Sequence, residues 1–314
     1  MSPGLPRRVV VEARAKLNLG LAVGPRRPDG FHELATVFQS ISLCDTLLAE
    51  RRSRGFTLRV RHEDAAVRGR LSRSARARVP AGPGNLALVA ARRFAQQAGL
   101  AGGARFTLIK RIPVRAGLGG GSADAAAALA AMAALHGVRP APAARGALEA
   151  GLGSDVPFAA LGGTVLGLGR GERLHPLAPL GACRALVAVP SWRVSTARAF
   201  GKIDRSKYGL TAWSTKLRFA QRLAHGRLTA SLAMRLGNRF ETVLGDRRSD
   251  FDSLCERLRE AGVGEPRMTG SGSAVFGLLA PRVPAGKVID RFVGNEALYV
   301  VRFTRSGVRL RRLP

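Results

Sequence analysis

Apolar and polar residues alternate in several segments of the first third of the chain. This alternation is typical of β-strands that bury one face. The pattern predicts strands over Arg8–Ala15 continuing into Leu17–Val23, over Phe56–Arg61 and over Ala104–Lys110. Between the last two strands the spacing becomes helical. The apolar residues of Asn85–Ala98 fall near one helical face, and Gly99 follows as a stop signal.

Farther along, alanine, leucine and methionine dominate Ala123–His136, directly after a glycine-rich segment, and favour a helix that begins at about Ser122 or Ala123. The second half adds two strands and two helices, predicted over Ala185–Val189, Ala274–Leu279, Thr215–Ala224 and Asp250–Ala261. Strands and helices mix without a regular βαβ rhythm, which favours an α+β fold over a doubly wound sheet. At 314 residues the chain has room for two domains of roughly 150 residues, and we divide it into 1–165 and 166–314.

Several classes of protein are disfavoured by composition. The longest uncharged stretches, such as Ala125–Val138, fall short of the roughly 20 residues that span a bilayer, and a secretory signal is not expected. The three cysteines, Cys44, Cys183 and Cys255, form no CxxC pair, so neither a disulfide framework nor a zinc site is expected. We therefore expect a cytoplasmic protein without membrane contact.

The formal net charge is +30, and only six of the 51 basic residues are lysines. Such a field attracts polyanions. The arginines concentrate in segments 51–78 and 302–312, yet neither segment interleaves the aromatic residues that stack on single strands. We interpret both segments as solvated faces, and a specific nucleic-acid site is not expected.

The strongest signal for chemistry is Lys110-Arg-Ile-Pro-Val-Arg-Ala-Gly-Leu-Gly-Gly-Gly-Ser-Ala-Asp-Ala-Ala127. Its glycines allow close approach of the backbone to a ligand, and the unpaired N–H groups of the following helix favour phosphate. No Lys-Ser/Thr pair follows the last glycine, so the segment is not a Walker A loop, and the acid of a dinucleotide fingerprint is missing. The segment therefore predicts a phosphate-binding loop of another type.

This loop resembles the ATP-phosphate loop of the GHMP kinases, the superfamily of galactokinase, homoserine kinase and mevalonate kinase. Two further motifs stand in the order of that superfamily. Ala15-Lys-Leu-Asn-Leu19 is similar to its N-terminal motif, and Met268-Thr-Gly-Ser-Gly-Ser-Ala274 to its C-terminal glycine motif. Each motif has moderate specificity, and the three together identify the chain as a member.

Flanking segments resemble one family within it, the 4-diphosphocytidyl-2-C-methyl-D-erythritol kinases. The matching segments are Arg26–Leu34, Leu43–Thr46, Asn85-Leu86, Leu152–Phe158 and Thr196–Phe200. The likeness runs from about residue 8 to residue 280 and is weakest across 51–82 and 202–260. Phe31 departs from the pattern, because it stands where the family usually has tyrosine.

The resemblance implies a ribosomal-protein-S5-domain-2-like N-terminal domain, a ferredoxin-like C-terminal domain and an active site in the cleft between them. It implies Mg²⁺-dependent transfer of the ATP γ-phosphoryl group to the 2-hydroxyl of the cytidyl substrate. Asp155 matches the family's catalytic base and Lys16 its charge partner. These roles suit the residue types, because a carboxylate can orient and deprotonate a hydroxyl while a lysine neutralises the moving phosphoryl group.

The same resemblance supplies the binding residues. For the cytidyl substrate they are Asn18, Phe31, His32, Thr196 and Phe200. For ATP they are Asn85, Lys110, Pro113, Gly117, Leu118, Gly119, Gly120, Gly121, Ser122 and Ala123. No residues are assigned to a protein metal site, and the oligomeric state, monomer or homodimer, stays open.

Two alternatives remain. A GHMP kinase could act on another alcohol such as homoserine or mevalonate, but the segments around His32 and Asp155 resemble only the cytidyl family. A non-catalytic, basic relative that binds nucleic acid would have lost Asp155 or Lys16, and both are present.

Overall fold

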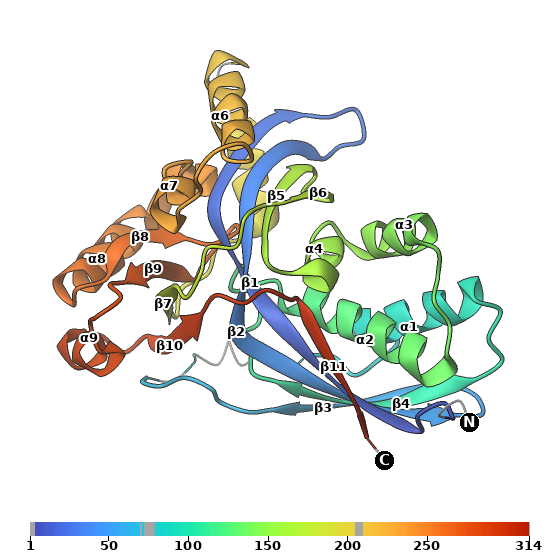
Figure 1. The fold of residues 1–314 in the computed structure, drawn as a ribbon. Helices are drawn as coiled ribbons and strands as arrows, with labels where there is room; N and C mark the ends of the chain where they lie inside the picture. Colours follow the sequence, from blue (N-terminus) through green and yellow to red (C-terminus); the bar gives the residue numbers. More distant parts are fainter. Residues whose placement is uncertain (1–3, 70, 72–78, 205–209, 314) are drawn as a thin grey trace.

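Two β-sheets form the frame of the molecule, and helices cover both of them (Figure 1). The structure, a computed structural model, describes residues 4–69, 71, 79–204 and 210–313. Of the arginine-rich segment 51–78, residues 70 and 72–78 lie outside the described residues. Within the described ranges, no helix combines the length and the apolar character that crossing a bilayer requires.

The first sheet has the strand order β11-β1-β2-β4-β3, and β5 and β6 extend it beside β2. Its strands are β1 (Arg8–Arg26), β2 (His32–Arg52), β3 (Phe56–His62), β4 (Gly103–Lys110), β5 (Thr164–Gly169), β6 (Arg173–Pro176) and β11 (Val308–Leu313). The two stretches predicted at the start of the chain form the single strand β1, which pairs along its length with β2 as a long antiparallel hairpin (Figure 1). The hairpin's β-bulges include one between Asn18 and Gly20, and such bulges re-aim side chains beside sites.

Four helices cover one face of this sheet: α1 (Leu86–Gln97), α2 (Gly120–His136), α3 (Pro142–Leu152) and α4 (Val156–Leu161). The central helix α2 is rich in buried alanines, whose small side chains allow close contact with β1 and α1. It begins at Gly120, so the predicted start at Ser122 or Ala123 was wrong. Gly119 precedes it in the left-handed region at φ +73°, a conformation that glycine adopts freely, and this permits the helix to begin inside the glycine run.

The second sheet has the strand order β10-β7-β9-β8. Its strands are β7 (Arg184–Val189), β8 (Gly264–Met268), β9 (Val275–Leu279) and β10 (Ala297–Arg302). With α8 (Arg248–Glu260) between β7 and β8 and α9 (Ala285–Arg291) between β9 and β10, the element order is the split βαβ of ferredoxin-like domains. The remaining helical segments are α5 (Thr196–Asp204), α6 (Leu210–Arg222), α7 (Ala230–Met234), η1 (Arg239–Val243) and η2 (Gly245–Arg247).

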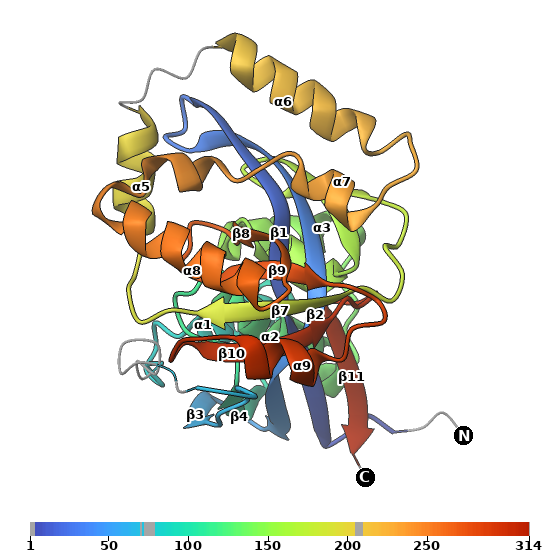
Figure 2. The ribbon, with the colours of Figure 1, turned by 90° about the vertical axis from the view of Figure 1, so that its left-hand side faces the viewer.

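The strand β7 connects the two hydrophobic cores. Its odd-numbered residues, Ala185, Val187 and Val189, belong to the large core that includes the first sheet, whereas Leu186 and Ala188 pack with the apolar side of α8. A strand buried on both faces has a continuous apolar sequence, and this explains why β7 shows no alternation. Figure 2 shows α8 and α9 on the outer side of the second sheet.

The expected α+β architecture is confirmed. The first sheet draws on both halves of the chain, because β11 returns from the C-terminal end to pair with β1. The division into 1–165 and 166–314 stays a prediction. Arg302, Arg305, Arg309, Arg311 and Arg312 of the basic tail are exposed, as a solvated face should be.

Candidate active site

Lys16 and Asn18 occupy alternate positions on β1 and are almost completely buried, with 6% and 4% of their surfaces exposed. The Lys16 ammonium donates a hydrogen bond to Asn18 Oδ1. The same nitrogen lies 3.8 Å from Oδ2 of Asp155. Asn18 is itself held in place, because its Nδ2 donates to Thr36 Oγ1 at 2.7 Å. The strand β1 therefore places Lys16 next to Asp155, the other predicted catalytic residue, although the two are far apart in sequence.

Asp155 occupies the N-cap position of α4, but its side chain makes no capping hydrogen bond. The carboxylate is 34% exposed and faces the cleft that contains Lys16. A carboxylate at this place is therefore free to meet a ligand. Burial lowers the pKa of Lys16, and the negative charge of Asp155 opposes that shift.

The glycine loop is tied to both sheets through its backbone. Lys16 N donates to Leu118 O at 3.0 Å, and Ala274 N donates to Ala116 O at 3.0 Å. Gly117 is required where the two glycine motifs meet, because it has φ +81° and an added Cβ would lie 2.2 Å from Thr269 O. Close backbone contact therefore fixes the loop against the C-terminal glycine motif.

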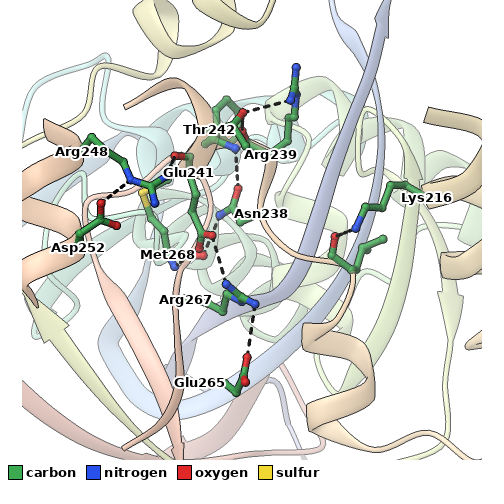
Figure 3. Close-up of polar contacts among 12 residues, drawn as sticks. Lys216, Asn238, Arg239, Glu241, Thr242, Arg248, Asp252, Glu265, Arg267 and Met268 are labelled. Atoms are coloured by element: carbon green, nitrogen blue, oxygen red, sulfur yellow. Dashed lines mark hydrogen bonds and ion pairs between the residues drawn. The ribbon is translucent and has the colours of Figure 1, made fainter. Parts of the chain in front are cut away.

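The C-terminal glycine motif is held by residues that the sequence did not single out. Asn238 Nδ2 donates to the carbonyl oxygens of Met268 and Gly270, each at 2.8 Å. Glu241 accepts a hydrogen bond of 2.8 Å from Met268 N, and Figure 3 shows these residues grouped around the start of the motif. Thr269 extends the network to the first sheet, since its Oγ1 accepts from Asn18 N at 3.0 Å.

Lys110, predicted to bind ATP, lies beneath the glycine loop between two buried carboxylates. Its ammonium donates to Asp45 and, at 2.8 Å, to Asp124 Oδ2. Asp45 also accepts from Arg111 N at 2.6 Å and Ile112 N at 2.9 Å, so it fixes the chain where β4 leaves the sheet. Burial raises the pKa of Asp124 to about 8, although Lys110 opposes that shift.

Two other predicted ATP residues lie in structural positions. Asn85 caps α1, accepting from Ala87 N at 2.9 Å, and Pro113 is buried. Lys110 lines a separate hollow of about 380 Å³ with His62 and Arg111 among its walls. The loop residues complete the predicted set: Leu118 and Ala123 are buried, Gly117, Gly119 and Ser122 line the cleft, Gly120 is half-buried and Gly121 is exposed.

A cavity of about 400 Å³ joins the Lys16–Asp155 pair to the predicted substrate residues. The predicted residues on its walls are Lys16, Asn18, Phe31, His32, Gly117, Gly119, Ser122, Asp155, Thr196 and Phe200. The segments of the chain that resemble substrate and phosphate sites thus meet around one space.

At one end of this cavity His32 and Phe200 stack, with ring centroids 4.9 Å apart and an angle of 24° between the rings. His32 Nε2 lies 2.7 Å from Oδ1 of Asp204. The Phe31 ring is 49% exposed, and the guanidinium of Arg170 lies 4.7 Å from its centroid. Asp204 and Arg170 were missed because neither belongs to a recognisable motif.

Comparisons with known proteins show the family of this chain. The family model for the GHMP kinases N terminal domain matches residues 85–163, and that for the GHMP kinases C terminal matches 223–296. A 4-diphosphocytidyl-2-C-methyl-D-erythritol kinase of Moorella thermoacetica is 39% identical over 285 residues, which cover 90% of this chain and 94% of the relative. A kinase of the same name from Pelotomaculum thermopropionicum is 38% identical over 293 residues, covering 93% and 96%.

Solved structures give the same result. A crystal structure of 4-(cytidine 5'-diphospho)-2C-methyl-D-erythritol kinase superposes with a TM-score of 0.72 at 34% identity, covering 94% of this chain and 98% of the other. A homoserine kinase of Cytophaga hutchinsonii shares the fold, with a TM-score of 0.69 at 18% identity and 99% coverage of both chains. The chain therefore belongs to the 4-diphosphocytidyl-2-C-methyl-D-erythritol kinase family of the GHMP kinases.

Proposed function

We propose that this chain transfers the γ-phosphoryl group of ATP to the 2-hydroxyl of 4-diphosphocytidyl-2-C-methyl-D-erythritol, a step of non-mevalonate isoprenoid synthesis. Its full-length relatives carry the name of that kinase. The observation that supports the proposal best is the position of the Lys16–Asp155 pair. The pair lines the same cavity as the glycine loop and the stacked rings of His32 and Phe200. Phosphate transfer from Mg-ATP, assayed with the cytidyl substrate, homoserine and mevalonate in parallel, tests the acceptor. Faster transfer to either of the other alcohols would contradict it.

Asp155 is placed to accept the proton of the attacking hydroxyl. The half-buried carboxylate faces the cleft and has no capping bond that would compete for its oxygens. Lys16, 3.8 Å from that carboxylate, offers positive charge where the phosphoryl group moves. Because its ammonium is buried, this charge is little screened by water.

The glycine loop and the first turn of α2 would bind the ATP phosphates through backbone N–H groups. Magnesium would enter with ATP and neutralise phosphate charge when bound. The described part of the chain has no cluster of three or more His, Cys, Asp or Glu side chains placed to hold a metal. This fits magnesium in a kinase, since the ion takes most of its ligands from phosphates and water. The Ser122 hydroxyl, on the cavity wall directly after the glycine loop, is an oxygen that would hold it.

His32 is oriented to recognise a pyrimidine edge. A carboxylate only accepts hydrogen bonds, so the contact with Asp204 places a hydrogen on His32 Nε2. In the neutral ring Nδ1 is then an acceptor, which suits the amino group of cytosine better than the carbonyl oxygen of uracil. The exposed Phe31 ring is available to stack on the base.

Replacing Phe200 by alanine should raise KM for the cytidyl substrate by an energy of roughly 1–3 kcal/mol, the range of base–aromatic stacking. Phe200 also supports the His32 ring and meets Phe240 edge-on at 4.9 Å, so both stacking and orientation would be lost. KM for ATP should hardly change. Steady-state kinetics with each substrate varied measure both constants, and Phe31→Tyr is the tolerated control. Equal effects on the two substrates, or a lower Tm with normal KM, would assign Phe200 to the core alone.

Replacing Gly121 by valine should weaken ATP binding at least about tenfold, or about 1.4 kcal/mol. Gly121 is exposed in the first turn of α2, and an added Cβ would have no atom within 4 Å, so the side chain would occupy only space that phosphate needs. Stability should not fall, because glycine is a poor helix former. At Gly120 an added Cβ would lie 3.1 Å from Ile112 and 3.2 Å from Lys110 Nζ, so Gly120→Val combines lost binding with overpacking.

Calorimetric titration with an ATP analogue, together with thermal unfolding, checks the Gly121 prediction. Unchanged affinity in a folded Gly121→Val protein would place the phosphate site elsewhere.

A further inference from the structure

A second, larger cavity of about 920 Å³ adjoins the active site. It lies between the start of α5, the segment around η2 and the two glycine motifs. Gly117, Thr196 and Ser271 line both cavities. The Thr196 and Ser271 hydroxyls are hydrogen-bonded at 2.6 Å and form part of the shared wall. A ligand in the second cavity would therefore lie next to the reacting groups.

The walls of this cavity are strongly cationic. They carry Arg115, Arg193, Arg198, Lys202 and Arg247, against the single carboxylate of Asp246 among the described lining residues. Of the five cations, only Arg247 has an ion pair within the part of the chain that the structure describes, with Asp250 at 2.9 Å. The proposed reaction uses none of these charges, so an excess of about four positive charges faces the space.

Arg193 is the most informative of the five. Its Nη2 atom is buried and has no hydrogen-bond partner among the described residues. Burial and the nearby charge of Arg115 both lower the pKa of Arg193. A buried, unpartnered donor beside a like charge is unfavourable, and an anion bound between the two guanidinium groups would remove both penalties.

Arg115 approaches the same space from the glycine loop. Its φ is +55°, in the left-handed region that residues other than glycine rarely adopt. Backbone strain of this kind is concentrated at ligand sites. Guanidinium groups bind phosphate through paired N–H donors, so two of them facing one cavity suit a chain of linked phosphates.

We propose that this cavity, lined by Arg115, Arg193, Arg198, Lys202 and Arg247, binds a diphosphate or longer phosphate chain at a place distinct from the ATP phosphates on the glycine loop. The phosphate chain could come from two sources. The diphosphate of the cytidyl substrate can extend past the shared wall, or a free polyphosphate can occupy the cavity. Both present the same chemistry to the arginines.

Calorimetric titration with inorganic tripolyphosphate tests the site on the full chain. A non-hydrolysable ATP analogue at saturation keeps the glycine loop occupied. The double variant Arg115→Ala/Arg193→Ala should bind tripolyphosphate at least about tenfold more weakly than the unaltered chain. The matched control, Arg302→Ala/Arg309→Ala, removes the same charge from exposed positions near the C-terminal end and should bind normally. Equal losses in both variants, or no loss in either, would overturn the proposal.

Steady-state kinetics then distinguish the two sources of the phosphate chain, and only this second measurement rests on the proposed function. If the substrate's diphosphate occupies the cavity, the double variant should raise KM for the cytidyl substrate, and that substrate should displace tripolyphosphate. If a free polyphosphate occupies it, KM should stay normal, and tripolyphosphate should alter the rate of the unaltered chain but not of the double variant. Because the titration needs no turnover, an inactive protein that binds tripolyphosphate would contradict the proposed function and leave this site intact.

Discussion

Asp155→Asn should reduce turnover by about 10²–10⁴-fold, the usual contribution of a general base. The amide keeps the shape of the side chain and can still accept one hydrogen bond, but it cannot take the proton of an attacking hydroxyl. It also removes the negative charge 3.8 Å from Lys16. Single-turnover measurements of phosphate transfer separate this loss of chemistry from any change in product release.

The fold and ATP affinity should survive this substitution. Asp155 makes no capping hydrogen bond, and its carboxylate is 34% exposed, so little native structure depends on its charge. Thermal unfolding and calorimetric titration of ATP check these two points. Asp252→Asn, on the outer surface of α8, is a control of the same chemistry and should be fully active. Turnover near normal in a folded Asp155→Asn protein would remove Asp155 as the base.

The parts of the site that sequence predicted are those encoded by local patterns. The sequence around Gly119 and Ala123 predicts both the glycines that permit close backbone contact and the helix that follows them. Lys16 and Asn18 stand two positions apart, a spacing that puts both side chains on one face of β1, where they are hydrogen-bonded. Their meeting with Asp155 depends on packing between distant segments, so only the family resemblance could predict it.

The elements that sequence missed are those whose stability comes from distant partners. The strand β2 is the clearest case, because its apolar and polar residues do not alternate regularly, and pairing with β1, β4 and β5 fixes its register. β11 was interpreted only as a basic tail, although its less exposed residues Val308 and Leu310 pack against the core. Apolar and polar residues do alternate at the start of β11, but its many arginines led to the interpretation as a solvated face.

The supporting roles of two residues were missed for a related reason. Asn238 and Asp45 act through backbone atoms that lie 30 or more positions away, at Met268 and Ile112. A single asparagine or aspartate in sequence is compatible with a turn, a cap or a surface position. Only the folded chain shows that these two side chains fix the loops on which the proposed phosphate site depends.

Lys16→Met should lower turnover by roughly 10²–10³-fold, the cost of removing one preorganised electrostatic group from an active site. Methionine has a similar length and retains the packing of the buried stem, so the lost feature is the charge. The free energy of unfolding, unlike turnover, should not fall at neutral pH. Burial lowers the pKa of Lys16, which means that the folded chain bears a desolvation cost for holding this proton.

The pH dependence gives this prediction a second, independent measurement. Because the folded pKa lies below the ordinary value of 10.5, the cost is fully present below the folded pKa and fades as the pH rises through the interval to 10.5. At neutral pH the methionine variant should therefore be at least as stable as the unaltered chain, and the difference should shrink toward pH 10.5. Denaturant unfolding of both proteins at several pH values, alongside kcat, measures it. A variant that is active, or one whose relative stability rises with pH, would show that Lys16 is not a buried charge held for catalysis.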